Sequence, residues 1–156
     1  MHRVTEIVPA DRADAARAGA TLTLSHGERH LRRKVIALGD GTDILIDLPD
    51  ARQLCHGDQL IIEDGRAVAI AAADEPLMEV TTSGHPSLAV LAWQIGNRHL
   101  AAEIRADRIL LERDHVIREM LTGLGATVSD VDAPFHPEAG AYARGHHHGA
   151  HKHAHD

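Results

Sequence analysis

The chain has 156 residues, enough for one ordinary domain or two small ones, and its 44% apolar content supports a folded core. Its formal charge at pH 7 is −7, and aromatic residues make up only 2% of it. Nucleic acid and anionic membranes bind positively charged surfaces, and proteins that bind single-stranded nucleic acid also use aromatic platforms. A negatively charged chain with few aromatic residues is a poor partner for both. No segment approaches the roughly 20 apolar residues of a membrane span, and the first residues form no apolar signal core. We therefore expect a cytoplasmic protein, in agreement with its single cysteine, Cys55.

The first half of the chain predicts a small all-β domain over residues 1–74. The Asp64-Gly65 pair is a strong signal for a β-hairpin, because two strand-like runs flank it directly. Residues 11–18 are rich in alanine and are compatible with either a turn of helix or a loop. The predicted strands are short runs rich in Val, Ile, Leu and Thr, at residues 3–8, 21–25, 34–38, 43–47, 59–63 and 66–71.

Residues 72–76 combine alanine, acidic residues and a proline, and we expect them to form a linker. Beyond them the pattern changes to mixed strand and helix, beginning with a strand at 77–82. A helix follows, with Pro86 expected at its first position and Gly96 at its end. Between these two residues, apolar side chains recur at helical spacing, at positions 88, 91 and 95.

Two more strands are predicted at 100–105 and 108–112, and Asp114 is placed to cap a second helix that Gly125 ends. A last strand is predicted at 127–131. This order, strand-helix-strand-strand-helix-strand, is that of the ferredoxin-like arrangement. The predicted fold class is therefore α+β, with an N-terminal small all-β domain (1–74), a ferredoxin-like βαββαβ domain (75–143) and a flexible, disordered His-rich tail (144–156).

The tail is the most distinctive segment, because six of its last eleven residues are histidine. Neutral imidazole is the commonest side-chain ligand for divalent late transition metals, so the tail predicts metal capture. The alternative interpretation is a purification tag. Tags, however, are usually unbroken runs of histidine, whereas glycine, alanine and lysine interrupt the histidines of this tail. Such a tail can deliver, store or sequester metal. The candidate ligands are His146, His147, His148, His151, His153 and His155.

In the folded part, His99 and His115 are the candidate metal ligands. A lone histidine such as His99 is more often structural than a ligand. A two-fold axis would bring two copies together, however, and each His99 would then be half of a metal site. His115 opens the second predicted helix, where its spacing alone favours a solvent-exposed side chain. Cys55 adjoins His56 instead of forming a C-x-x-C pair, so a zinc knuckle is unsupported and Cys55 is expected to be a small buried residue.

Catalytic signatures are weak throughout the sequence. There is no G-x-S-x-G, no H-E-x-x-H and no glycine-rich phosphate loop with its lysine. The acidic residues have the pattern of a solvated surface, and the folded part offers only scattered histidines where a metallohydrolase needs about three fixed ligands. We therefore expect a protein that is not an enzyme.

Several short motifs follow one another in the second half of the chain. They are Gly96-Asn97-Arg98-His99, Arg108-Ile109-Leu110, Asp114-His115-Val116, Met120-Leu121, Leu124-Gly125 and the run 134–142. In this order and spacing they resemble the urease accessory nickel chaperone family, whose members combine a β-rich domain, a ferredoxin-like domain and a His-rich tail. The resemblance covers essentially the whole chain and is most specific over residues 96–142.

The resemblance implies a homodimer formed through the second domain, with nickel held between the two copies of His99. It also implies a first domain similar to the peptide-binding domain of a co-chaperone, which contacts urease or its assembly factors. The partner that receives the metal would be the urease accessory GTPase. Some members have a second metal site at the positions of residues 113 and 115, but Arg113 leaves that site incomplete here.

These observations together predict a nickel metallochaperone that delivers Ni²⁺ for assembly of the urease active site. Imidazole sites follow the Irving–Williams order, so Zn²⁺ and Cu²⁺ should also bind in vitro, and only the resemblance selects nickel. Two alternatives stay open. A storage or detoxification protein would depend on the tail and not on His99, and a peptide-binding assembly factor would use its first domain, with metal incidental.

Overall fold

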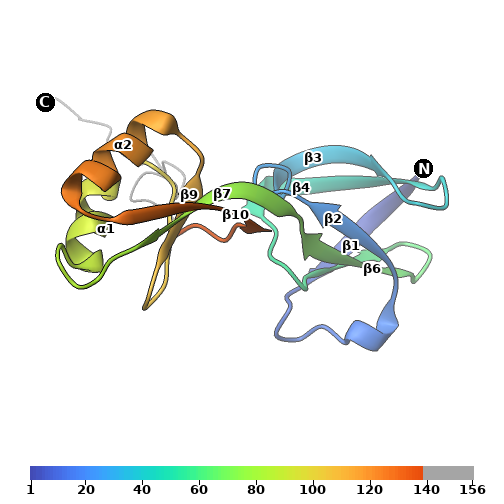
Figure 1. The fold of residues 1–156 in the computed structure, drawn as a ribbon. Coiled ribbons are helices and arrows are strands. Elements are labelled where there is room, and N and C mark those ends of the chain that lie inside the picture. The colour runs from blue at the N-terminus through green and yellow to red at the C-terminus, as the bar shows by residue number, and fades with distance from the viewer. Residues whose placement is uncertain (139–156) are drawn as a thin grey trace, which may run out of the picture. The chain divides into compact units, whose positions relative to one another are not determined.

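The computed structural model describes residues 1–138, which form two compact units. The first unit contains Met1–Pro76 and Asp132–Phe135, and the second contains Leu77–Val131 and the described residues from His136 onward. Strands predominate, and two α-helices occur in the described part of the chain (Figure 1). The predicted two-domain chain, mostly sheet with two helices, is confirmed, whereas the predicted tail lies outside the described residues.

The first unit is built on a six-stranded sheet in the order β2-β6-β5-β1-β4-β3. β1 pairs with β4 and β2 with β6 in parallel, while the other neighbours are antiparallel. The alanine-rich segment forms one 3₁₀ turn, Ala15–Arg17. Aliphatic side chains such as Ile44, Ile46 and Leu60 form the core. The strands are β1 (His2–Val8), β2 (Ala18–Leu24), β3 (His30–Ala37), β4 (Asp43–Gln53), β5 (Gln59–Ile62) and β6 (Ala67–Ala72).

The predicted hairpin at Asp64-Gly65 is confirmed, since β5 and β6 are antiparallel neighbours with Gln59 opposite Ala69. Gly65 has φ = 90°, a left-handed conformation that glycine adopts without steric cost. The Asp64 carboxylate accepts the backbone N–H of Arg66 at 3.0 Å, which closes the turn locally.

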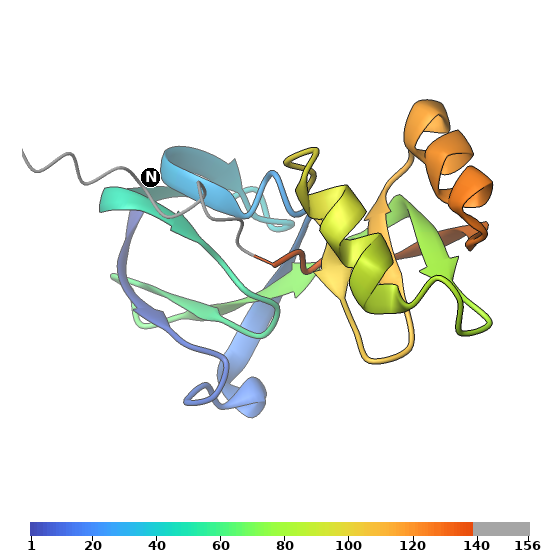
Figure 2. The same ribbon diagram turned by 90° about the vertical axis from the view of Figure 1, so that its left-hand side faces the viewer.

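The second unit has a four-stranded sheet in the order β10-β7-β9-β8, with β9 antiparallel to both neighbours. Both helices share one apolar core with alternate residues of β7 and β9, including Met78, Val80 and Leu111, so they cover the same face of the sheet. Figure 2 shows α1 in front of these strands. The elements are β7 (Asp74–Thr81), α1 (Leu88–Gly96), β8 (Glu103–Ile104), β9 (Ile109–Glu112), α2 (His115–Leu124) and β10 (Thr127–Pro134).

The helix ends follow from capping chemistry. Asp114 accepts the N–H groups of Val116 and Ile117 at 2.9 and 3.0 Å, and Gly125 ends α2 with φ = 104°, as predicted. For α1 the prediction is wrong, because Ser87 is the N-cap and Pro86 lies before the helix. The Ser87 hydroxyl provides the acceptor that the first turn needs, and proline has none to offer.

The predicted linker at 72–76 does lie at the boundary of the two units, which falls after Pro76, but it is strand and not a loop. Only Ala73 separates β6 from β7, and its N–H donates to the Leu24 carbonyl at 2.9 Å. The Glu75 carboxylate accepts the N–H of His26 at 2.9 Å, so this polar segment is fixed by long-range bonds that its composition does not reveal. A strand was expected at 100–105, but the structure has only the two-residue strand β8 there. No helix among the described residues has the length and apolar character to cross a membrane.

Candidate metal centre

His99 lies on an exposed turn directly after α1. Its N–H donates to the Gly96 carbonyl at 3.0 Å, and its φ of 57° is left-handed, a conformation that histidine adopts more readily than most side chains. The turn reverses the chain at the carboxyl end of α1, where the helix dipole carries partial negative charge. An imidazole at this position can bind a cation that the helix end also attracts.

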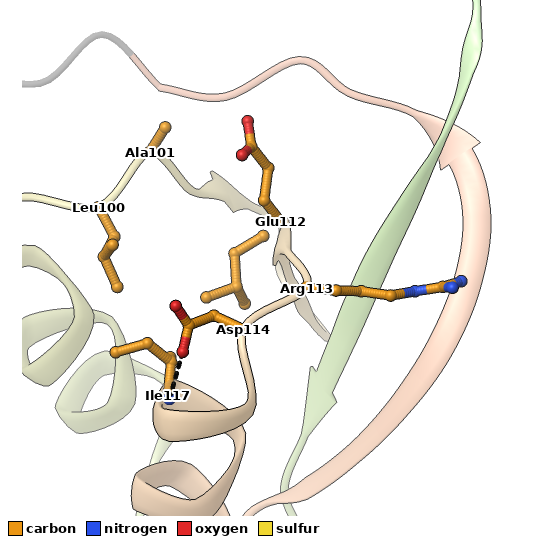
Figure 3. A pocket seen from close by; sticks show the side chains of 7 residues that line it. Leu100, Ala101, Glu112, Arg113, Asp114 and Ile117 are labelled. Atoms are coloured by element: carbon orange, nitrogen blue, oxygen red, sulfur yellow. Dashed lines mark hydrogen bonds between the residues drawn. The ribbon is translucent and has the colours of Figure 1, made fainter.

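A cavity of about 170 Å³ opens immediately beyond this turn. Figure 3 shows the carboxylates of Glu112 and Asp114 at the cavity, while the side chain of Arg113 points away from it. Two carboxylates at this cavity favour cations over anions. The lining residues are Leu100, Ala101, Leu111, Glu112, Arg113, Asp114 and Ile117.

His115 is the exposed first residue of α2. The amino end of a helix repels cations, so this position is electrostatically poorer than that of His99, although the Asp114 carboxylate precedes it. Arg113 donates to the carbonyls of Leu77 and Val131, both at 3.1 Å. A guanidinium has no lone pair to offer a metal, so position 113 adds no ligand beside His115.

The chain that leads into the tail passes close to the His99 turn. The N–H of Glu138 donates to the Ala102 carbonyl at 2.8 Å, only three residues after His99 in sequence. The N–H of His136 donates to the Glu103 carboxylate at 2.8 Å. Sequence reasoning missed Glu103, because a glutamate beside an apolar strand residue gives no signal that it is buried.

No three histidine, cysteine or carboxylate side chains converge on one point within residues 1–138. Ions bound by imidazole generally need about four to six ligands, so a site at His99 requires groups from a second copy or from the tail. The six tail histidines lie outside the described residues, and so does the prediction that they bind metal.

Cys55 is exposed, so the prediction that it is buried is wrong. The buried residue of this turn is Asp58. Its carboxylate accepts the N–H groups of Cys55 and Ala10 at 2.8 and 2.9 Å. The Nδ1 atom of His56 accepts the N–H of Ala72 at 3.1 Å. These bonds fix the turn within the first unit.

The structure is that of a two-domain protein whose second unit exposes the imidazoles of His99 and His115. Residues 4–73 match the N-terminal domain, and residues 75–156 the C-terminal domain, of the family described as UreE urease accessory protein. The chain belongs to this family, as the sequence motifs predicted. It is therefore an accessory protein and not an enzyme.

Curated relatives support the same assignment over nearly the full chain. A urease accessory protein UreE from Chelativorans sp. is 55% identical over 137 residues, covering 88% of this chain and 86% of the relative. The UreE protein of Mesorhizobium japonicum is 52% identical, covering 92% and 74%. The protein called UreE 1 from Brucella suis is 50% identical, covering 94% and 90%.

Proposed function

We propose that this protein is a cytoplasmic nickel metallochaperone that binds Ni²⁺ and delivers it for assembly of the urease active site. The observation that carries the proposal is the place of His99, exposed at the negative end of α1 and three residues before the Ala102 carbonyl that holds the base of the tail. Glu138, the last described residue, is therefore bound only three positions along the chain from His99. Relatives named for urease accessory function supply the biological context.

The ion-binding unit in this proposal is a homodimer formed through the second domain. A cyclic dimer doubles every surface group, so two His99 imidazoles can face each other across the axis. The exposed face of α1 supports a second copy as the partner, because Trp93 and Val90 are 63% and 47% exposed and lie three residues apart on one side of the helix. Leu91 and Ile95 bury the opposite side in the core.

Four steps then follow from the chemistry of the ligands. Tail histidines collect Ni²⁺, the paired His99 residues hold it, and tail histidines complete the tetragonal or octahedral coordination that Ni²⁺ prefers. Docking to the urease accessory GTPase brings new ligands, and the ion passes by ligand exchange. His115 adds a possible weak ligand from each copy. Zn²⁺ and Cu²⁺ compete for the same imidazoles in vitro, so selectivity rests with the partners and the metal supply.

In this proposal the domain over residues 1–74 binds partners. A ferredoxin-like domain over residues 75–143 binds metal and forms the dimer, and the tail at 144–156 captures metal. The element order of the second unit supports the ferredoxin-like assignment. For the first unit, the supporting feature is a cavity of about 320 Å³ beside β2, which ends the sheet and has no strand on its outer side within residues 1–138. Such an edge can accept an extended peptide.

The central test is nickel calorimetry on the full-length His99→Ala protein. We expect the tightest binding step to be lost, together with nickel-dependent activation of urease in a reconstituted system. His85→Ala is the matched control, since His85 is also an exposed histidine of the second unit but precedes α1 instead of following it. A folded His99→Ala protein with unchanged affinity and unchanged urease activation would reject the proposal.

Storage or sequestration is the second candidate, favoured by the density of histidine in the last eleven residues. It predicts several weak ions per chain, all of which vanish when the six tail histidines become alanine, and no effect of His99→Ala. A tight ion that survives the tail replacement would decide against storage as the main function.

A further inference from the structure

The strand β3 ends the six-stranded sheet of the first unit, at the opposite end from β2. On one side it pairs with β4, with Arg33 opposite Asp47 and Ala37 opposite Asp43, and on the other side no strand lies within residues 1–138 (Figure 1). Six of its eight residues are exposed, and only Leu31 is buried. In an antiparallel ladder, alternate residues point their N–H and C=O groups away from the partner strand. The outer edge of β3 therefore presents backbone donors and acceptors to solvent.

Basic residues are concentrated on this strand. It carries Arg32, Arg33 and Lys34 and no acidic residue, although the whole chain has 16 lysine and arginine residues against 23 acidic ones. The Arg33 side chain is 70% exposed, and its salt bridge to Asp47 is long, at 4.0 Å. In the described part of the chain, Arg32 and Lys34 form no salt bridge. The strand is thus a positively charged edge on a negatively charged protein.

The side chains of β3 offer different contacts on its two faces. Successive side chains alternate along a strand, so Lys34 and Ile36 share one face and Arg33 and Val35 share the other. Ile36 packs against the core. Val35 lies opposite the buried Leu45 but is itself 49% exposed, so it has apolar surface left to bury. A strand added at this edge would meet a cation on each face and an apolar contact at Val35.

Protection against aggregation is the simplest role for charges on an edge strand. Such an edge repels strands of its own charge, but it attracts a strand of the opposite charge. Nucleic acid is another polyanion that these cations could attract. Its phosphate oxygens accept hydrogen bonds without donating any, so the outward C=O groups of the strand would stay unpaired. The net charge of −7 also repels a long polyanion, which favours a short acidic polypeptide segment.

We propose that the outer edge of β3 binds an extended, acidic segment of a partner protein as an additional strand. Backbone hydrogen bonds along the edge supply affinity. Acidic side chains beside Arg33 and Lys34, together with an apolar side chain beside Val35, supply specificity. This inference goes beyond the proposed nickel site and the cavity beside β2, and its test uses no metal.

The test is an NMR titration of the full-length protein, without metal, with the blocked synthetic peptide Ser-Thr-Val-Glu-Glu-Val-Thr-Ser. The order of its side chains is the same in both directions, so parallel and antiparallel pairing present the same charges to the edge. We expect changes in the backbone amide signals centred on residues 33–37. The Kd should be roughly 0.1–1 mM, because a short unstructured peptide loses conformational freedom on binding.

Two control peptides separate charge from strand pairing. Glutamine in place of both glutamates should weaken binding by roughly three- to tenfold, because the ion pairs with Arg33 and Lys34 are lost. Proline in place of both valines keeps the charge but removes two backbone N–H groups, and it should abolish binding. Equal binding of the proline peptide would show a nonspecific attraction and would overturn the proposal.

Reversal of one charge on the protein provides an independent comparison. Lys34→Glu should weaken binding of the acidic peptide and strengthen binding of the same peptide with lysine in place of glutamate. Arg12→Glu is the matched control, because it changes the net charge equally at an exposed position outside β3. It should leave both affinities near those of the parent. An effect of the same size in both variants would assign the attraction to net charge and overturn the proposal.

Three further outcomes would also overturn it. Unchanged amide signals at millimolar peptide would leave the charges of β3 as protection against aggregation alone. Changes centred on β2 would place strand addition at the other end of the sheet. Tighter binding of a single-stranded oligothymidylate than of the acidic peptide would make the edge a site for nucleic acid.

Discussion

Arg29 donates a hydrogen bond of 2.7 Å to the carbonyl of Phe135, a residue 106 positions later in the chain. The same guanidinium donates to the Leu54 carbonyl at 3.3 Å, and Arg29 is only 2% exposed. Phe135 is fully buried, and its ring meets the ring of His26 edge-on at 5.6 Å. Carbonyl oxygens therefore solvate this buried cation, and they attach the segment after β10 to the first unit.

Replacement of Arg29 by methionine should destabilise the first unit by about 2–4 kcal/mol, because methionine fills much of the space but leaves two buried carbonyls without their donor. Urea unfolding, followed by circular dichroism, measures this change. Arg33→Met is the matched control, since the Arg33 side chain is 70% exposed and should contribute less than about 0.5 kcal/mol. Equal stabilities for the two variants would show that the Arg29 bonds add nothing.

This bond also illustrates what could be predicted from the sequence. The hairpin at Asp64-Gly65 and the helix ends at Asp114 and Gly125 were predictable, because their signals are local and each residue acts on its immediate neighbours. The burial of Arg29 was not predictable, since its acceptors lie 25 and 106 residues away.

The candidate site divides in the same way. The Gly96-Asn97-Arg98-His99 motif makes His99 a candidate ligand at the level of sequence, and the structure places it on an exposed turn after α1. The burial of the Glu103 carboxylate was not predictable, because one of its hydrogen bonds comes from a residue 33 positions away. Pro86 was predicted at the first helical position, but the helix begins after Ser87, whose hydroxyl provides the capping acceptor.

The pKa of the Asp64 carboxyl lies below its ordinary value, chiefly because the backbone N–H of Arg66 donates to it and secondarily because the Arg66 guanidinium does so at 2.8 Å. A lowered pKa stabilises the fold above pH 3.8, the ordinary value, and this contribution is lost as the pH falls through the lowered value. Arg66→Met keeps the backbone donor, so most of the lowering should persist in a carboxyl NMR titration. A pKa restored to its ordinary value would assign the effect to the guanidinium, and Arg33→Met should change nothing.

The proposed dimer predicts that Trp93→Asp shifts the protein toward monomer in light scattering at micromolar concentrations. A buried charge at the centre of an apolar interface costs several kcal/mol, whereas the same residue in a monomer stays in water. Val35→Asp is the control, because Val35 is 49% exposed on β3 of the first unit and should leave the oligomer unchanged. An unaltered dimer in the Trp93 variant would place the interface elsewhere.

The number of histidine ligands can be counted from the pH dependence of nickel binding. Protons compete with metal for imidazole, so affinity is full above the imidazole pKa and falls as the pH drops through it. Free imidazole titrates near pH 6.5, and proton competition of this kind lowers metal affinity about tenfold per histidine ligand between pH 7.5 and pH 5.5.

Two copies of His99 alone therefore predict a loss of about 100-fold over this range, and each tail histidine on the same ion adds about another tenfold. Calorimetry at several pH values, on the parent and on the variant with six tail alanines, gives both counts. The nickel affinity of the parent should fall more steeply with decreasing pH than that of the variant. The additional factors of ten lost by the parent between pH 7.5 and pH 5.5 equal the number of tail histidines that bind the tight ion. An affinity that is flat with pH would exclude histidine ligation, and identical slopes for the two proteins would remove the tail from that site.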